Sequence, residues 1–240
     1  MRHRTVSGKI RYLSLKPGRE GQERGREWFT FTHHGDGSVI MRARCEIEDP
    51  DPPLLRDVVL HIGPDRMPRN LLLHLTLGDE FLGTGWMAHD PDAGTISCES
   101  HGPAIGRNSE SCEAGEFDAF GTHPVVGDGF TTRLLDTAMG PHKRALRFFV
   151  PSPDHRGASA PQIARVEMTM EYVGEEERKV AAGTFACRHF RYVDDSEDGM
   201  GGTRHPDFDI WVTADDDAVL VYASIEGYMM NAYELVELSR

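Results

Sequence analysis

Apolar and polar residues alternate with a period of two along most of the chain, while helical periodicity is nearly absent. In the stretch ARVEMTMEYV, residues 164–173, one face carries Val166, Met168, Met170 and Tyr172. The other face carries charged residues and a threonine. The stretch SVIMRARCEIE, residues 38–48, alternates in the same way. This pattern is typical of antiparallel strands that bury one face.

Short turn sequences separate these runs. The segments HHGDGS (33–38), DPDAGT (90–95) and TADDDA (213–218) each carry the Asp or Gly chemistry that hairpin loops require. Two longer segments, 101–118 and 151–162, are rich in Gly, Pro and Ser, and we expect them to form rim loops. About ten strands result, linked mainly by hairpins or short loops.

A meander of this size must protect its edge strands, and closure into a barrel does so completely. The sequence therefore predicts an all-β protein in which residues 1–240 form a single domain. We expect one antiparallel, lipocalin-like β-barrel of about ten strands with long rim loops, rather than an open sandwich. Barrels of eight or more strands can enclose a ligand.

The C-terminal third resembles bacterial lipocalin-like, or calycin-like, β-barrel domains of largely unassigned function. The resemblance lies in GTFACRHFRYV and HPDFDIWVTADDDAVLVYASI, residues 183–193 and 205–225. The matching positions are Arg188, His189, Phe190, Asp209, Ile210, Trp211 and 219–221. The resemblance extends over 184–234 and implies a barrel fold. It leaves the function open, because related barrels include both carriers and enzymes.

The charge of the chain narrows the classes of partner. Lys and Arg number 26 against 39 Asp and Glu, which gives a net charge of -13 and a pI near 5.3. Such a surface repels nucleic acid and disfavours anionic membranes. A small hydrophobic molecule is the partner that remains compatible with it, and strand edges are compatible with a homodimer.

Cofactor and export signals are missing from the sequence. There is no P-loop, dinucleotide fingerprint or G-x-S-x-G elbow, and no histidine spacing that favours a metal. We therefore expect no cofactor. The four cysteines are scattered and read as reduced thiols. The first residues, MRHRTVSGKIRYLSL, hold no apolar run of signal-peptide length, so the simplest expectation is a cytoplasmic protein.

The stretch AFGTHPVVGDGF, residues 119–130, is the main candidate for chemistry. Pro124 favours an extended backbone at His123 and leaves the imidazole free to project. Asp128 is close enough to orient one ring nitrogen, so that the other serves as a general base or acid. The alternative is that Asp128 and Gly129 form a turn and His123 caps a loop.

Further candidates are spread over several strands. Arg188 or a tyrosine, Tyr172 or Tyr228, would hold a substrate oxygen, although an arginine on a mostly apolar face also suits a structural ion pair. Trp86, Trp211 and Tyr228 would line the wall of a pocket. Core packing explains these aromatic residues as well.

His74 lies within LLLHLTLG, residues 71–78, and points into the lumen only if the leucines face outward. The aliphatic filling of small barrels favours the opposite arrangement.

Three hypotheses follow. The first is a cofactor-independent enzyme, of lyase, hydratase or isomerase type, with His123 and Asp128 as its acid–base pair. The second is a non-catalytic carrier of a small hydrophobic ligand in the same fold. The third is a solidly packed structural or interaction module without a cavity.

Overall fold

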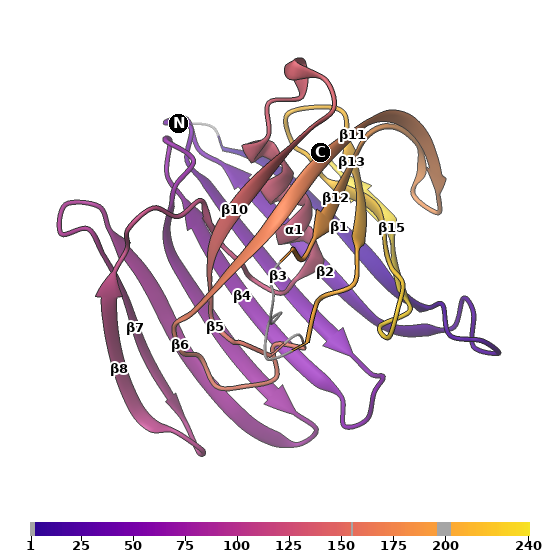
Figure 1. Ribbon diagram of the computed structural model, residues 1–240. Coiled ribbons are helices and arrows are strands. Elements are labelled where there is room, and N and C mark those ends of the chain that lie inside the picture. The colour runs from indigo at the N-terminus through magenta and orange to yellow at the C-terminus, as the bar shows by residue number, and fades with distance from the viewer. Residues whose placement is uncertain (1–2, 155, 196–202) are drawn as a thin grey trace.

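The computed structural model describes residues 3–154, 156–195 and 203–240. Within these residues, fifteen strands form one sheet (Figure 1). The strands of the first half are β1 (Arg4–Ser14), β2 (Glu23–His33), β3 (Val39–Ile47), β4 (Leu54–Ile62), β5 (Pro68–Leu77), β6 (Glu80–Asp90), β7 (Thr95–Gly102) and β8 (Gly106–Glu113). Those of the second half are β9 (Ala119–Phe120), β10 (His142–Val150), β11 (Ala164–Val180), β12 (Gly183–Val193), β13 (Phe208–Thr213), β14 (Leu220–Ile225) and β15 (Asn231–Ser239).

The first and last strands join the two halves of the sheet. β1 pairs with β15 from Ser7 opposite Ser239 to Ser14 opposite Asn231. The order is β8-β7-β6-β5-β4-β3-β2-β1-β15-β14-β13-β12-β11-β10-β9, antiparallel throughout except for the parallel pair of β9 and β10. In this order β8 and β9 stand at opposite edges, so the described sheet does not close. The predicted all-β class is confirmed, but about ten strands was too few and the closed barrel was wrong.

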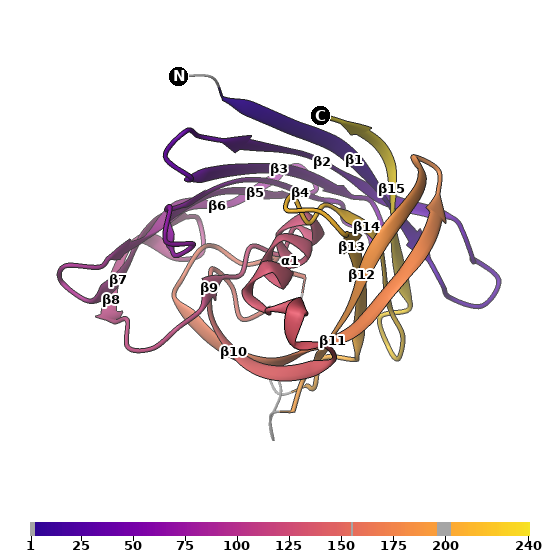
Figure 2. The same cartoon turned by 90° about the horizontal axis from the view of Figure 1, so that it is seen from above.

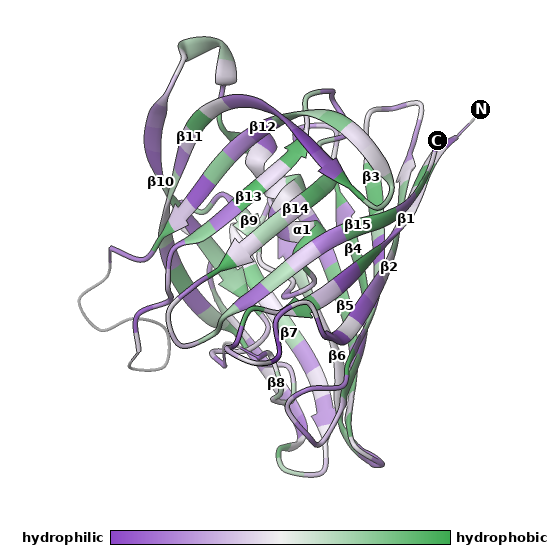
Figure 3. Cartoon of the chain, turned by 90° about the vertical axis from the view of Figure 1, so that its right-hand side faces the viewer, coloured by the Kyte–Doolittle hydropathy of each residue, from purple (hydrophilic) through white to green (hydrophobic). Residues whose placement is uncertain are grey.

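The sheet curls around a short internal segment (Figure 2). This segment contains the helix α1 (Val125–Thr131) and the 3-10 turns η1 (Thr132–Leu134) and η2 (Thr137–Met139). Most of the strands present a buried row to this interior, whereas β8 has no buried residue, and Figure 3 shows bands of hydrophobic and hydrophilic residues along the strands. In β3 the alternation predicted from the sequence is confirmed, because Val39, Met41, Ala43 and Cys45 are buried and Ile47 on the same face is partly buried. The turns at 33–38, 90–95 and 213–218 also join strands as expected.

The two segments expected to be rim loops differ from that prediction. Residues 101–118 contain the end of β7 and all of β8. Residues 151–162 do form a loop where they are described, but it enters the interior, with Ser152 and Ala160 buried. Gly83 makes room for it, since a Cβ there would lie 2.9 Å from the Cβ of Ala160. Glycines on the inner face of the sheet thus admit a loop that we expected outside.

A buried carboxylate anchors α1 inside the curled sheet. Glu27, on β2, is fully buried and accepts hydrogen bonds from the backbone N–H groups of Val125 and Val126, both at 3.0 Å. The Tyr12 hydroxyl donates to the same carboxylate at 2.5 Å, and the Cys45 thiol at 3.4 Å. The first N–H groups of a helix have no partner within the helix. Glu27 satisfies two of them and fixes the start of α1.

All four cysteines are free thiols, as the sequence predicted. None of the helices in the described ranges has the length and apolar character needed to cross a membrane.

Replacing Glu27 by Gln is expected to destabilise the protein by about 1–3 kcal/mol, because the amide NH₂ would face a buried backbone N–H and leave that donor unsatisfied. Chemical denaturation measures the free energy of unfolding. The matched control is Glu20→Gln in an exposed loop, which should change stability by less than about 0.5 kcal/mol. Equal effects of the two substitutions would contradict the anchoring role of Glu27.

Candidate functional site

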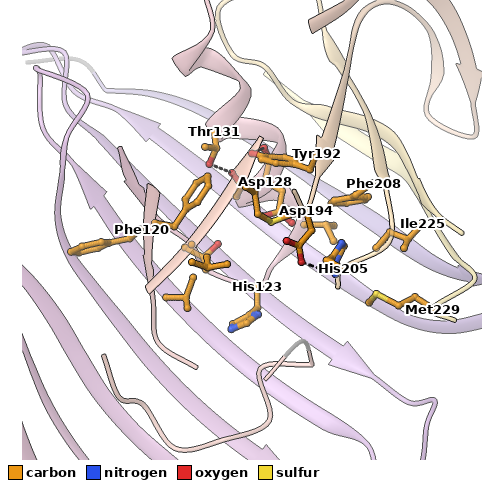
Figure 4. A pocket seen from close by; sticks show the side chains of 18 of the residues that line it. Phe120, His123, Asp128, Thr131, Tyr192, Asp194, His205, Phe208, Ile225 and Met229 are labelled. Carbon is orange, nitrogen blue, oxygen red and sulfur yellow. Dashed lines mark hydrogen bonds between the residues drawn. The ribbon is translucent and has the colours of Figure 1, made fainter. Parts of the chain in front are cut away.

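A cavity of about 140 Å³ lies between α1 and the inner face of the second half of the sheet (Figure 4). Its walls are mainly apolar, with contributions from Phe120, Val125, Phe148, Val150, Val166, Met168, Phe208, Ile225 and Met229. Fewer residues with polar side chains line the cavity: Thr122, His123, Asp128, Thr131, Tyr192, Asp194, His205 and Tyr233. We call this space the larger cavity, to distinguish it from a neighbouring cavity of about 50 Å³ on the other side of α1.

The fold brings these residues together from distant parts of the sequence. Alternation along β10, β11 and β12 turns Phe148, Val166 and Tyr192 towards the interior. The segment between β9 and α1 contributes His123, and α1 itself contributes Asp128. Because Glu27 fixes the first residues of α1, it also fixes where Asp128 lies along the cavity wall.

His123 reaches the larger cavity by an unexpected backbone conformation. We predicted an extended residue before Pro124, but His123 has a φ of 66°, in the left-handed region. This conformation is uncommon for residues other than glycine, although histidine tolerates it better than most. The His123 ring packs against Gly157, where a Cβ would lie 2.7 Å from the ring and 2.5 Å from the guanidinium of Arg56. Gly157 therefore lies against both the His123 ring and the buried guanidinium of Arg56.

Asp128 belongs to a helix rather than to the turn that we kept as an alternative. Burial raises the pKa of its carboxyl well above the usual value, the negative charge of Glu27 raises it further, and Arg56 acts in the opposite direction. A raised pKa means that the neutral acid is favoured inside the cavity. The Tyr192 hydroxyl donates to the backbone carbonyl of Asp128 at 3.4 Å, so this end of the cavity is polar.

His123 and Asp128 line the same cavity, but their pairing stays a prediction. The charges that shift the pKa of Asp128 are those of Glu27 and Arg56. Figure 4 shows the His123 ring pointing away from Thr131 and Tyr192.

Sequence reasoning missed part of the polar wall. Asp194 follows β12 and accepts a hydrogen bond from the backbone N–H of His205 at 2.8 Å. Tyr233 comes from β15, and burial raises its pKa to about 12. Alternation along β12 and β15 indicates inward positions for Tyr192 and Tyr233. No spacing in the sequence connects Asp194 to His205, because the approach of β12 to the segment before β13 depends on the whole sheet.

Three predicted residues lie inside the sheet or near its rim, but outside the walls of the larger cavity. Tyr172 is buried and packs on Phe190, with 5.2 Å between the ring centroids. Arg188 forms an ion pair with Glu175 at 3.7 Å, which is the structural role that we weighed against substrate binding. Tyr228 follows β14 in a loop and is 54% exposed.

The other three predicted residues lie on the outer face. The leucines of β5 fill the interior, so His74 faces outward, where it stacks on Phe81 at 5.3 Å between centroids. Trp86 is exposed on the neighbouring strand. Trp211 is buried outside the main core, with the guanidinium of Arg178 3.7 Å from its ring centroid. None of these three side chains therefore lines the larger cavity.

The whole chain shares its architecture with a solved structure. A crystal structure of a beta-barrel-like protein of the domain of unknown function DUF1849 from Brucella abortus matches 99% of this chain and 96% of its own, with a TM-score of 0.56 and 11% identity. A putative exported protein with a YmcC-like fold from Bacteroides fragilis matches 98% of this chain and 95% of its own, with a TM-score of 0.40 and 8% identity. No family model and no curated protein matches the sequence.

The first of these similarities shows a barrel-like fold over the full chain. It extends beyond the C-terminal third, where the sequence resembled lipocalin-like domains. At this low identity the similarity concerns the fold alone.

The raised pKa of Asp128 predicts a specific pH dependence of stability. A carboxyl with a folded-state pKa above its unfolded value, 3.8, contributes stability below that value and loses it as pH rises through the folded-state pKa. Asp128→Asn cannot lose a proton. Its free energy of unfolding relative to wild type should therefore increase as pH rises from about 4 through that window.

Denaturant titrations between about pH 4 and 8 measure this difference. Repeating the comparison in the Glu27→Gln background removes the titration of Glu27, whose charge acts on Asp128. Asp79→Asn, at an exposed turn, is the control. A difference between Asp128→Asn and wild type that stays constant over the range would contradict a raised pKa.

Proposed function

We propose that the protein binds a small, largely apolar molecule with one hydrogen-bonding group in the larger cavity. The observation that carries this proposal is the placement of Asp128, a carboxyl with a raised pKa, in an otherwise apolar wall. Apolar cavities with a few convergent polar groups are the usual form of small-molecule sites. In this proposal the ligand lies against the inner face of the curved sheet, as in lipocalins.

The volume of the larger cavity limits the size of the ligand. At about 140 Å³ it is close to engineered cavities of about 150 Å³ that bind benzene. The ligand is therefore a single ring or a short branched chain rather than a long lipid. A protonated Asp128 would donate a hydrogen bond to a ligand oxygen.

Acid–base catalysis is the second candidate. It is favoured by the presence of Asp128, His123 and His205 in one cavity, because a carboxyl with a raised pKa keeps its proton to higher pH than an ordinary one and can then act as an acid. In this case Asp128 would donate a proton to the bound substrate, and a histidine would remove a proton from it. Turnover that survives the combined replacement of His123 and Asp128 would contradict it.

Phenol and toluene are matched probes for the proposed binding. Both fit a cavity of benzene size, and only phenol offers an oxygen to Asp128. Wild type is expected to bind phenol about fivefold more tightly, which corresponds to one additional hydrogen bond. Asp128→Leu should reduce the affinity for phenol to that for toluene. Ligand-detected NMR or calorimetry provides both dissociation constants.

Filling the cavity tests where the probes bind. Val166→Phe should abolish binding of both probes, because Val166 lines the larger cavity. Val173→Phe on the same strand is the control, because Val173 is 37% exposed and does not line it. Absence of binding to wild type, or binding that survives Val166→Phe, would contradict the proposal.

A further inference from the structure

A second, smaller cavity of about 50 Å³ lies beside α1, facing the first half of the sheet. Its apolar wall comes from β3, β4, β9 and α1, and includes Val39, Met41, Leu60, Ile62, Phe120 and Phe130. It shares Phe120, Gly127 and Thr131 with the larger cavity, so the two spaces adjoin the same internal segment. We call it the smaller cavity.

Two arginines stand together in the wall of the smaller cavity. Arg66 comes from the turn between β4 and β5, and Arg133 from η1. The Arg66 guanidinium donates to the backbone carbonyl of Arg133 at 3.4 Å, and the Arg133 guanidinium lies 4.5 Å from the ring centroid of Phe130. Across the residues that the structure describes, no carboxylate within 4.0 Å forms an ion pair with either arginine.

The positive charges of Arg66 and Arg133 are only partly balanced by the acidic residues around them. Burial and the charge of Arg66 lower the pKa of Arg133, while Asp216 and Asp217 act in the opposite direction. Asp217 is already engaged by two hydrogen bonds from Arg4, at 2.9 and 2.5 Å.

One carboxylate, Asp118, also lines the smaller cavity. It is engaged by the guanidinium of Arg144, and by the backbone N–H of Arg147 at 2.9 Å. Asp118 is therefore not an ion-pair partner of Arg66 or Arg133.

We propose that the smaller cavity binds a short-chain monocarboxylate, with the carboxylate between Arg66 and Arg133 and the alkyl chain against the apolar wall. Guanidinium groups match the planar geometry of a carboxylate and bind it through charge-assisted hydrogen bonds. The volume, about a third of that of the larger cavity, leaves room for a short alkyl chain only, with the carboxylate at the opening beside the exposed Arg66. This site goes beyond the proposed function, because it uses a different cavity and a different ligand group.

Isothermal titration calorimetry with butyrate tests the site. Butan-1-ol and inorganic phosphate serve as comparison probes, the first without charge and the second without an alkyl chain. Wild type is expected to bind butyrate at least tenfold more tightly than either one. Arg66→Gln and Arg133→Gln should each weaken butyrate binding about tenfold, the loss of a hydrogen bond to a charged group.

Arg42→Gln is the matched control, because Arg42 is exposed on the outer face of β3 and its substitution removes the same charge. Arg66 is exposed as well, so Arg66→Gln should fold even if Arg133→Gln does not. Equal binding of butyrate and butan-1-ol, tighter binding of phosphate, or an effect of Arg42→Gln equal to that of Arg66→Gln would each overturn the proposal. Phenol binding in the larger cavity should remain unchanged in Arg66→Gln, which separates this test from that of the proposed function.

Discussion

The carboxylate of Glu27 holds the inside of this molecule in place. It lies fully buried on β2, in the first half of the sheet, and binds the first two N–H groups of α1. A curled sheet of this kind has an interior too wide for its own side chains to fill, and the segment between β8 and β10 occupies that space. Without a fixed partner, the N–H groups at the start of α1 would be buried and unsatisfied. The position of the helix therefore depends on one side chain.

The chemistry of the larger cavity follows from the same interaction. Glu27 fixes α1, and α1 presents Asp128 to a wall of Phe, Val, Met and Tyr side chains. The negative charge of Glu27 also raises the pKa of Asp128, while Arg56 works against it. Two acids and one buried arginine thus share the interior. Burial raises the pKa of both acids, but at Glu27 the hydrogen bonds from Tyr12, Cys45 and the start of α1 act in the opposite direction and favour the carboxylate. This combination makes the cavity suitable for a ligand that is apolar apart from one oxygen or nitrogen.

Local patterns in the sequence located several of the strands and their hairpins, but neither the number of strands nor the open edges of the sheet. Alternation located the buried rows of β3 and β11, and Asp/Gly turns located the hairpins, because both signals act within about ten residues. Whether the edge strands β8 and β9 meet is decided by the curvature of the whole sheet and by the segment inside it. Neither the curvature of the sheet nor the position of the internal segment can be recognised from a short stretch of sequence. The same limit explains why the loop after β10 was expected on the rim.

The candidate site was partly predictable for a similar reason. His123 and Asp128 were found because proline, glycines and a carboxyl coincide in one stretch, and both line the larger cavity. Asp194 and His205 come together only through the fold. His74, Trp86 and Trp211 face outward, since other residues form the buried rows of their strands: leucines in β5, Gly83 and Met87 in β6, and Ile210 and Val212 in β13.

The proposed function depends most on Asp128, a carboxyl whose pKa is raised by burial in the wall of the larger cavity. A ¹³C NMR titration of its side-chain carboxyl, assigned by comparison with Asp128→Asn, tests it most directly. The structure predicts a pKa well above 3.8 that falls towards the ordinary value when Glu27 is replaced by Gln. A pKa near 3.8 that is indifferent to Glu27 would contradict both the electrostatics of the cavity and the function proposed for it.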